Sequence, residues 1–406
     1  MSNKDKIIWL LTLILFCSFT IFETYSWGRY VLLGVSVLIA LFSIIDNSSN
    51  YRYVIGSYHY HFLALIFFTF MSSAWGMAFN DPISKGITLT EIFFCIFFVY
   101  NYYYYKEDGV YRLLSVIKWS SYLIAVYSLL FYGVDYITQM VQSGVRIENE
   151  YANINTIGML TAVGITIQID QIFANKRFSL SALFCIPSFY MLIATQSRKA
   201  FVMLIVGVIL SAVFRNVDSR NGAKTVIRIC LIAVISVVLI RQILKLPIFS
   251  AVMNRMDKLM ASLTGEGDAG RSAMLRKQMV EIGLKQFKKT PLLGIGIGCS
   301  HLIVKPVIGS DTYLHNNYIE LLACGGLVGL IVYYSFYLDL FYNYLSHRGF
   351  AYDEAYTTCL ILMMILVVTE YGFVALFSKS TYFFFMVFFL EKARMTEGRG
   401  RIPILR

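Results

Sequence analysis

The segment YIELLACGGLVGLIVYYSFYLDLF, residues 318–341, is an almost unbroken apolar run. A helix needs about 20 apolar residues to cross the hydrocarbon core of a bilayer, and this run has that length. Similar runs occupy residues 7–22, 30–45, 60–79, 87–105, 113–133, 156–174, 180–195, 200–214, 226–244, 355–369 and 372–390. The sequence therefore predicts an all-α polytopic membrane protein with about 12 transmembrane helices.

The composition supports this interpretation. Of the 406 residues, 58% are hydrophobic and only 15% are charged, whereas a soluble domain is typically about 25% charged. The net charge of +11 fits cytoplasmic loops rich in Lys and Arg, so we expect no nucleic-acid partner. The seven cysteines are scattered and form no C-x-x-C pair, which indicates packing residues.

The distribution of basic residues predicts the orientation of the chain. With a cytoplasmic N-terminus, most Lys and Arg residues of the short loops fall on the inner side, as the positive-inside rule requires. The first run has a basic start but no small-residue cleavage site after it, so we interpret it as a span and not as a signal peptide. Both termini are then predicted to be cytoplasmic.

Four segments follow from this orientation. They are residues 1–244 with nine spans, a large extracytoplasmic loop over residues 245–314, residues 315–391 with three spans, and a cytoplasmic tail over residues 392–406. Two carboxylates, Asp170 and Glu370, lie near predicted span ends. We expect both of them to be solvated.

The extracytoplasmic loop contains a predicted amphipathic helix over residues 271–289, which suits the outer membrane surface. Asp268 would cap its start, and Pro291 follows its end. At helical spacing, its predicted apolar face consists of Ala273, Val280, Leu284 and Phe287. Its lysines are expected to form a solvated face.

Arg271 is the cation of this helix that we assign a function. It stands in the first turn, where unpaired backbone N–H groups and the helix dipole attract an anion. Arg276, on the same helix, is a candidate substrate contact.

A glycine string follows the predicted helix. Gly294, Gly296 and Gly298 form G-x-G-x-G, but the strand and βαβ setting of a nucleotide fingerprint are missing. We therefore predict a tight backbone path that folds back over the membrane face. Gly325 and Gly329 form a small-x-x-x-small pair, which lets two membrane helices approach closely.

Polar residues also interrupt the apolar runs at two other places on the predicted outer side. Residues 197–199, Ser-Arg-Lys, form the tip of a short hairpin, where the cations Arg198 and Lys199 are unexpected by the positive-inside rule. An arginine at membrane depth is a functional candidate. The loop of residues 146–155 places Arg146, Glu148 and Glu150 ahead of two asparagines. This loop could contact sugar, and the alternative is that its charges pair with one another.

His315 precedes the start of the 318–341 run, on the same predicted side as Arg198 and Arg271. Histidine ordinarily titrates near neutral pH and can take a proton from a sugar hydroxyl. Its neighbours able to hydrogen-bond hydroxyls are Asn316, Asn317 and Tyr318. No further ligand cluster accompanies His315, so we predict no metal site.

The order of these motifs resembles the O-antigen ligase and O-antigen polymerase superfamily, over roughly residues 190–330. The residues that carry the resemblance are Ser197-Arg198-Lys199-Ala200, Gly270-Arg271, Pro291-Leu-Leu-Gly294-Ile-Gly296, His315-Asn316-Asn317-Tyr318-Ile-Glu320 and Gly325-Gly326.

The resemblance implies a metal-independent C-type glycosyltransferase without a cofactor, located in a bacterial inner membrane. Its donor would be an oligosaccharide linked through diphosphate to undecaprenol. Its other partners would be the glycan acceptor, membrane lipids and a chain-length regulator. By resemblance, Arg198 and Arg271 would hold the diphosphate, and His315 would act on the acceptor hydroxyl.

Three functions stay open at this point. A polymerase would join lipid-linked repeat units, and the Tyr- and Phe-rich spans with Asn153-Ile-Asn155 favour it. A ligase would transfer the lipid-linked glycan to the lipid A core. A transporter of polysaccharide lipids is an alternative of another class, although transporters usually show repeated halves, which we do not find here.

Overall fold

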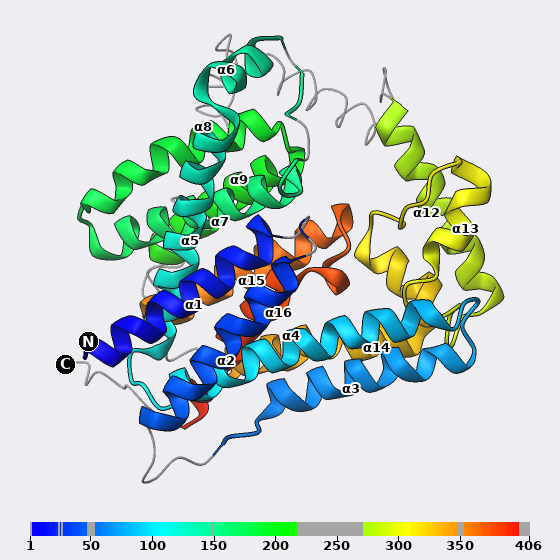
Figure 1. Ribbon diagram of the computed structural model, residues 1–406, viewed down its shortest axis with the longest axis horizontal. Coiled ribbons are helices and arrows are strands. Elements are labelled where there is room, and N and C mark those ends of the chain that lie inside the picture. The colour runs from blue at the N-terminus through cyan, green and yellow to red at the C-terminus, as the bar shows by residue number, and fades with distance from the viewer. Residues whose placement is uncertain are drawn as a thin grey trace. The chain divides into compact units, whose positions relative to one another are not determined.

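The computed structural model of this chain describes residues 2–22, 25, 27–46, 53–143, 145–147, 150–216, 271–347 and 353–397. Within these residues the regular elements are helices, with no strand among them (Figure 1). Six helices of this described part are long and apolar enough to cross a membrane. The expected all-α polytopic membrane fold is confirmed. The predicted span at 226–244 and the predicted cap Asp268 lie outside the described residues.

The other predicted spans coincide with helices. They are α1 (Asn3–Ile21), α2 (Gly28–Asp46), α3 (Ser57–Met71), α4 (Asn80–Tyr104), α5 (Gly109–Tyr132), α7 (Ile154–Asn175), α8 (Cys185–Thr195) with η2 (Leu180–Phe184) before it, α9 (Arg198–Asn216), α14 (Asn317–Ser346), α15 (Glu354–Thr369) and α16 (Lys379–Thr396). α3 ends before residue 79 because a short 3₁₀ turn, η1 (Ser72–Ala74), follows it. α16 begins later than residue 372, since η5 (Glu370–Gly372) and η6 (Ala375–Phe377) precede it.

Three further helices lie outside the membrane runs. α12 (Arg271–Lys289) has the bounds that the sequence predicts. α6 (Val134–Ser143) and α13 (Ser300–Ile308) were not predicted. α6 and α13 have ten residues or fewer. A helix of that length is too short for its periodicity to be recognised in the sequence.

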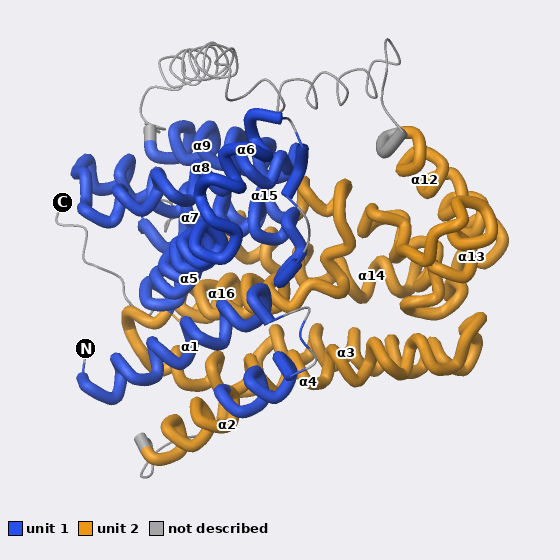
Figure 2. The backbone as a smooth tube through the Cα atoms, turned by 45° about the horizontal axis from the view of Figure 1, so that its top comes forward, with its two compact units in different colours: residues 1–35, 110–260, 349–366 blue, residues 36–109, 261–348, 367–406 orange. Residues whose placement is uncertain are grey.

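Contacts divide the chain into two compact units, which Figure 2 colours separately. Unit 1 comprises residues 1–35, 110–260 and 349–366, and unit 2 comprises residues 36–109, 261–348 and 367–406. The units are defined by contacts between residues, whereas the four predicted segments are defined by their position relative to the membrane. The units therefore do not test the four segments, which stay predictions.

In unit 1, α7 packs against α8 and α9, and a buried ion pair holds one end of this group. Asp170 of α7 accepts hydrogen bonds from Arg215 Nε at 3.0 Å, from Arg215 Nη2 at 2.7 Å and from Thr358 Oγ1 at 2.6 Å. The side chain of Asp170 is buried. The expectation that Asp170 is solvated is therefore wrong, because the fold supplies a bidentate arginine that compensates its burial.

In unit 2, α3 and α4 lie side by side, and α14 packs against α3, while α12 and α13 gather at one end of α14 (Figure 1). Gly329 faces the Phe68 ring of α3, with only 2.9 Å between the ring and the position of an added Cβ. The prediction that this glycine lets two helices approach closely is confirmed. A Cβ added at Gly325 would lie 3.4 Å from the same ring.

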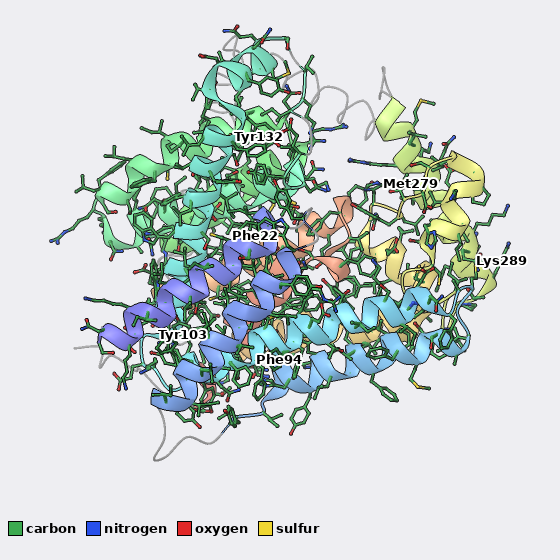
Figure 3. The ribbon with its side chains drawn as sticks, in the orientation of Figure 1. Phe22, Phe94, Tyr103, Tyr132, Met279 and Lys289 are labelled. Atoms are coloured by element: carbon green, nitrogen blue, oxygen red, sulfur yellow. The ribbon has the colours of Figure 1, made fainter. Side chains whose placement is uncertain are left out.

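α12 packs against the rest of unit 2 through residues outside the predicted apolar face. Met279, labelled in Figure 3, is buried with Val304, Leu314 and Ala323, whereas Leu284 is 39% exposed. Leu284 belongs to the apolar face predicted for the outer membrane surface, and that placement stays a prediction. α12 meets α14 and the preceding turn through Gly283, where an added Cβ would lie 2.3 Å from Ile319.

α14 is broken at Gly326, whose φ of 61° and ψ of −160° are not helical. The freed backbone groups pair with residues 291–296. Ile295 and Gly296 donate to the carbonyls of Ala323 and Cys324 at 3.1 and 2.9 Å. In return, the N–H groups of residues 327 and 328 donate to the carbonyls of residues 291 and 292 at 2.8 and 3.1 Å. The glycine string thus forms a tight backbone path, as predicted. It also supplies hydrogen-bond partners for the backbone groups that the break in α14 leaves unpaired.

The same string also contacts the turn after α3. Met77 N–H donates to Ile295 O at 2.8 Å, and Ile297 N–H donates to Ser72 Oγ at 3.1 Å. Both segments belong to loops that the basic-residue distribution places outside. At the other end of unit 2, Lys392 contacts Asp339 at 2.7 Å, and both were predicted near the cytoplasm. Segments predicted on the same side of the membrane thus contact each other in the structure. Which of the two ends faces the cytoplasm stays a prediction.

Thiol labelling would test that direction. In a chain with all seven native cysteines replaced, a cysteine at Ser310 should react with a membrane-impermeant maleimide added to intact cells, and one at Glu107 should not. Both positions are exposed in loops, so access through the membrane decides the outcome. Labelling at residue 107 alone would reverse the topology and place His315 in the cytoplasm.

Candidate functional site

His315 lies in the turn between α13 and α14. Its backbone is left-handed, with a φ of 54°, a conformation that is uncommon outside glycine although histidine tolerates it better than most residues. The Tyr313 ring lies 4.3 Å from the imidazole, centroid to centroid, and Thr312 Oγ1 is 3.2 Å from Nε2. The side chain is half-buried. Neighbours within the turn thus orient the ring and leave part of it accessible.

The other histidine of this region is held differently. His301 Nε2 lies 2.9 Å from Asp81 Oδ2, and its Nδ1 lies 3.1 Å from Asp311 Oδ1. The hydrogen bond from Lys305 is the main influence that lowers the pKa of Asp311. Carboxylate oxygens thus lie within 3.1 Å of both ring nitrogens. His301 therefore belongs to a charged cluster that joins α4 to α13, and we keep His315 as the candidate base.

Two arginines of α12 belong to the predicted site. Arg271 is the first residue of the helix, as predicted, but its side chain lies outside the described residues. Burial lowers the pKa of the Arg276 guanidinium, while Tyr313 and Tyr371 act in the opposite direction. Arg276 thus lies near the residue whose ring contacts His315. A partly desolvated guanidinium gains from a bound anion.

Basic residues also gather in unit 1, around the loop between α8 and α9. Arg146 donates through Nε to Thr195 O at 3.2 Å and through Nη2 to Asn155 Oδ1 at 2.7 Å. Ser197 Oγ donates to the same Asn155 oxygen at 3.2 Å. The fold therefore brings the 146–155 loop and the Ser-Arg-Lys hairpin together, although they are distant in sequence.

Helix ends add to the positive potential of this group. Asn153 caps α7 through a hydrogen bond from Asn155 N–H at 2.9 Å, and Arg198 is the first residue of α9. Helix N-termini carry unpaired N–H groups and about half a positive charge. Arg198 and Lys199 are half-buried in the first turn of α9. Two helix starts and three cations make this end of unit 1 suited to an anion.

Residues 183–334 match the family model Wzy_C, described as O-antigen ligase. These residues are similar to the O-antigen ligase family. The resemblance to the ligase and polymerase superfamily is thereby confirmed. No curated protein matches the chain. The O-antigen ligase region includes Arg198, Lys199, Arg271, Arg276 and His315, whereas Arg146 precedes it.

The O-antigen ligase region combines elements of both units. Arg198 and Lys199 lie in unit 1, and Arg271, Arg276 and His315 lie in unit 2. Within unit 2, the structure brings Arg276 and His315 toward a common neighbour, Tyr313. In the described residues, no group of His, Cys, Asp and Glu could hold a metal ion.

Three predicted substrate contacts have structural partners. Asn316 caps α14 by accepting from Ile319 N–H at 3.2 Å. Asn317 is buried and donates to Glu370 Oε2 at 2.8 Å. Tyr318 donates to Val367 O at 2.6 Å. These contacts give all three residues a role in the fold, so we carry only His315 from this motif into the proposed chemistry.

The burial of two carboxylates, Glu320 inside the matched region and Glu370 outside it, was not predicted. Glu320 is part of the motif around His315, and Glu370 was expected to be solvated. Both are 0% exposed, so the expectation for Glu370 is wrong. The sequence offered one signal, because Tyr337, which contacts Glu370 with Tyr333 and Tyr334, follows them by four and three residues, the spacings that bring helical side chains together.

Proposed function

We propose that this protein is a glycosyltransferase that polymerises undecaprenyl-diphosphate-linked oligosaccharide repeat units on the outer face of a bacterial inner membrane. The O-antigen ligase match carries the proposal, because one matched region contains both candidate diphosphate arginines and the candidate base. A membrane-spanning fold suits a lipid-linked donor. Both termini would then be cytoplasmic, and a chain-length regulator would be a partner.

Arg198 and Arg271 would bind the diphosphate of the donor. A guanidinium contacts phosphate oxygens through two parallel N–H groups, which both orients the group and stabilises the charge that develops as it leaves. Both residues begin helices, where the backbone already favours an anion. Lys199, Arg276 and Arg146 would contribute further positive charge near these positions.

His315 would activate the acceptor. The acceptor hydroxyl oxygen attacks C1 of the donor sugar, the bond from C1 to the diphosphate oxygen breaks, and His315 takes the hydroxyl proton. The products are a new glycosidic bond and undecaprenyl diphosphate. In this mechanism the arginines take the place that a metal ion has in other transferases.

A ligase is the second candidate, because the matched family is described as O-antigen ligase. The purified protein in liposomes should be given lipid-linked repeat units with and without lipid A core oligosaccharide. A polymerase lengthens the lipid-linked glycan without the core acceptor, whereas a ligase requires the core and attaches glycan to it. Movement of intact lipid-linked glycan across the bilayer, with no release of undecaprenyl diphosphate, would favour a transporter.

We expect Arg198→Ala and Arg271→Ala to weaken donor binding. Each removes charge-assisted hydrogen bonds that contribute about 1.5 to 3 kcal/mol, or roughly 10-fold to 150-fold in Kd. Replacement by Lys should restore part of the loss, since the charge stays but the fork geometry is lost. Titration with a fluorescent lipid diphosphate would give Kd for each variant.

Lys289→Ala is the matched control. Lys289, labelled in Figure 3, is an exposed cation at the opposite end of α12 from Arg271. Its removal changes the net charge by the same amount but leaves the helix start intact. An equal loss of binding in Lys289→Ala and Arg271→Ala would mean that general surface charge, and not a site, attracts the donor.

A further inference from the structure

Glu320 lies under the turn that carries His315 and connects three segments. Its Oε2 accepts from Leu314 N–H at 3.0 Å, and its Oε1 accepts from Ser300 Oγ at 2.6 Å. Leu314 immediately precedes His315, and Ser300 is the first residue of α13. One buried carboxylate of α14 thus fixes the backbone on the N-terminal side of His315.

Glu370 holds the other side of the same turn through Asn317. Asn317 Nδ2 donates to Glu370 Oε2 at 2.8 Å, and Asn317 Oδ1 accepts from Leu376 N–H at 3.0 Å. The carboxylate is itself fixed by three tyrosine hydroxyls, from Tyr333 at 2.9 Å, Tyr334 at 2.6 Å and Tyr337 at 2.7 Å. Among the described residues, every donor to Glu370 is neutral, so the carboxylate is held there by hydrogen bonds and not by an ion pair.

The turn between these two carboxylates needs support from its surroundings. The left-handed backbone of His315 is unfavourable for a side chain with a Cβ and persists where neighbouring structure holds it. The hydrogen bonds at Leu314 and Asn317 flank His315 by one and two residues. They are therefore placed to set the direction in which the imidazole leaves the backbone.

We propose that Glu320 and Glu370 are positioning residues for His315, acting as hydrogen-bond acceptors that fix the turn from both sides. The expected effect on turnover rests on the proposed function of His315. The geometric part of the proposal, that the two carboxylates hold the turn in place, does not depend on that function. A base displaced by about 1 Å can lose roughly 10²-fold in rate, so a loosened turn should lower kcat while the lipid-linked donor still binds.

Glu320 is tested with a conservative and a disruptive variant. Glu320→Gln keeps one acceptor for Leu314 N–H, and its amide can donate to Ser300 Oγ, so kcat should stay close to that of the unchanged protein. Glu320→Leu removes both acceptors and should lower kcat by about 10²-fold, with the KM for the donor little changed. A large loss in Glu320→Gln would overturn the proposal, because it would mean that the charge or proton of Glu320 acts directly.

Glu370 allows an exchange of the two hydrogen-bonding partners. Asn317→Asp places a carboxylate against Glu370 and should lower kcat by about 10²-fold, because the turn loses this contact. Adding Glu370→Gln to Asn317→Asp restores a donor and an acceptor with their roles reversed, and kcat should recover. A double variant no better than Asn317→Asp alone would contradict the assignment.

Hydrogen–deuterium exchange tests directly, without measuring transfer activity, whether Glu320 holds the turn. Hydrogen–deuterium exchange over residues 309–317 should speed up in Glu320→Leu and stay unchanged in Glu320→Gln. Unchanged exchange in Glu320→Leu would refute the geometric part of the proposal. In a His315→Ala background, Glu320→Leu should lower turnover no further, since the residue that it positions is gone.

These variants separate the proposed role of His315 from the positioning roles of Glu320 and Glu370. If His315→Ala keeps full transfer activity, the proposed function of His315 is wrong, whatever the exchange data show. If His315→Ala is inactive but Glu320→Leu and Asn317→Asp both keep full kcat, the proposed function stands and the positioning roles are refuted. An additive loss in the double variant would give Glu320 a role separate from His315.

Discussion

His315→Ala should lower the turnover of glycan transfer by roughly 10²-fold to 10⁴-fold, which is the usual contribution of a general base. Binding of the lipid-linked donor should persist, because the proposed diphosphate contacts come from other residues. The two effects separate when kcat is measured by transfer in liposomes and Kd by titration with the lipid diphosphate. Full transfer activity in folded, membrane-inserted His315→Ala would refute the proposed mechanism.

Two control variants sharpen this experiment. His315→Asn removes the base but tolerates the left-handed backbone better than alanine, so an equal loss in both variants assigns the effect to chemistry and not to strain. His301→Ala removes the other histidine of the region, which is held between Asp81 and Asp311. A loss of turnover in His301→Ala, with His315→Ala active, would move the base to His301.

Gly326→Ala should prevent most of the protein molecules from reaching the native fold. The φ and ψ of Gly326 lie in a region that is essentially restricted to glycine and costs other residues about 1 to 3 kcal/mol. An added Cβ would also lie 2.4 Å from the carbonyl of Leu292. The clash displaces the backbone pairing with residues 291–296, at about 0.5 to 1.5 kcal/mol for each lost hydrogen bond.

Size-exclusion profiles and Tm values after detergent extraction would measure this effect. Gly294→Ala should resemble Gly326→Ala, because its Cβ would lie 2.3 Å from the carbonyl carbon of Cys324. Gly309→Ala is the matched control, since Gly309 also has a positive φ of 77° but nothing within 4 Å of an added Cβ. If all three variants behave alike, backbone strain and not the broken-helix contact explains the loss.

Local sequence patterns predicted much of this protein correctly. Apolar runs predict helices because a bilayer core leaves no water for backbone groups, which must then bond within the segment. The bounds of α12 follow from its periodicity and from Pro291 after its end. The short motifs around Arg198, Arg271 and His315 also suffice to indicate the family, since their order along the chain requires no knowledge of contacts.

Only the tertiary structure decided which polar groups are buried and what they contact. Asp170 and Glu370 look alike in sequence, yet one pairs with Arg215 and the other is surrounded by tyrosine hydroxyls. The face of α12 that packs, and the break of α14 at Gly326, likewise depend on residues distant in sequence. A sequence pattern records the propensity of a segment, whereas burial and hydrogen-bond partners depend on which other segments pack against it. For this reason the sequence determined the helices and the candidate chemistry, and the fold determined what holds His315 in place.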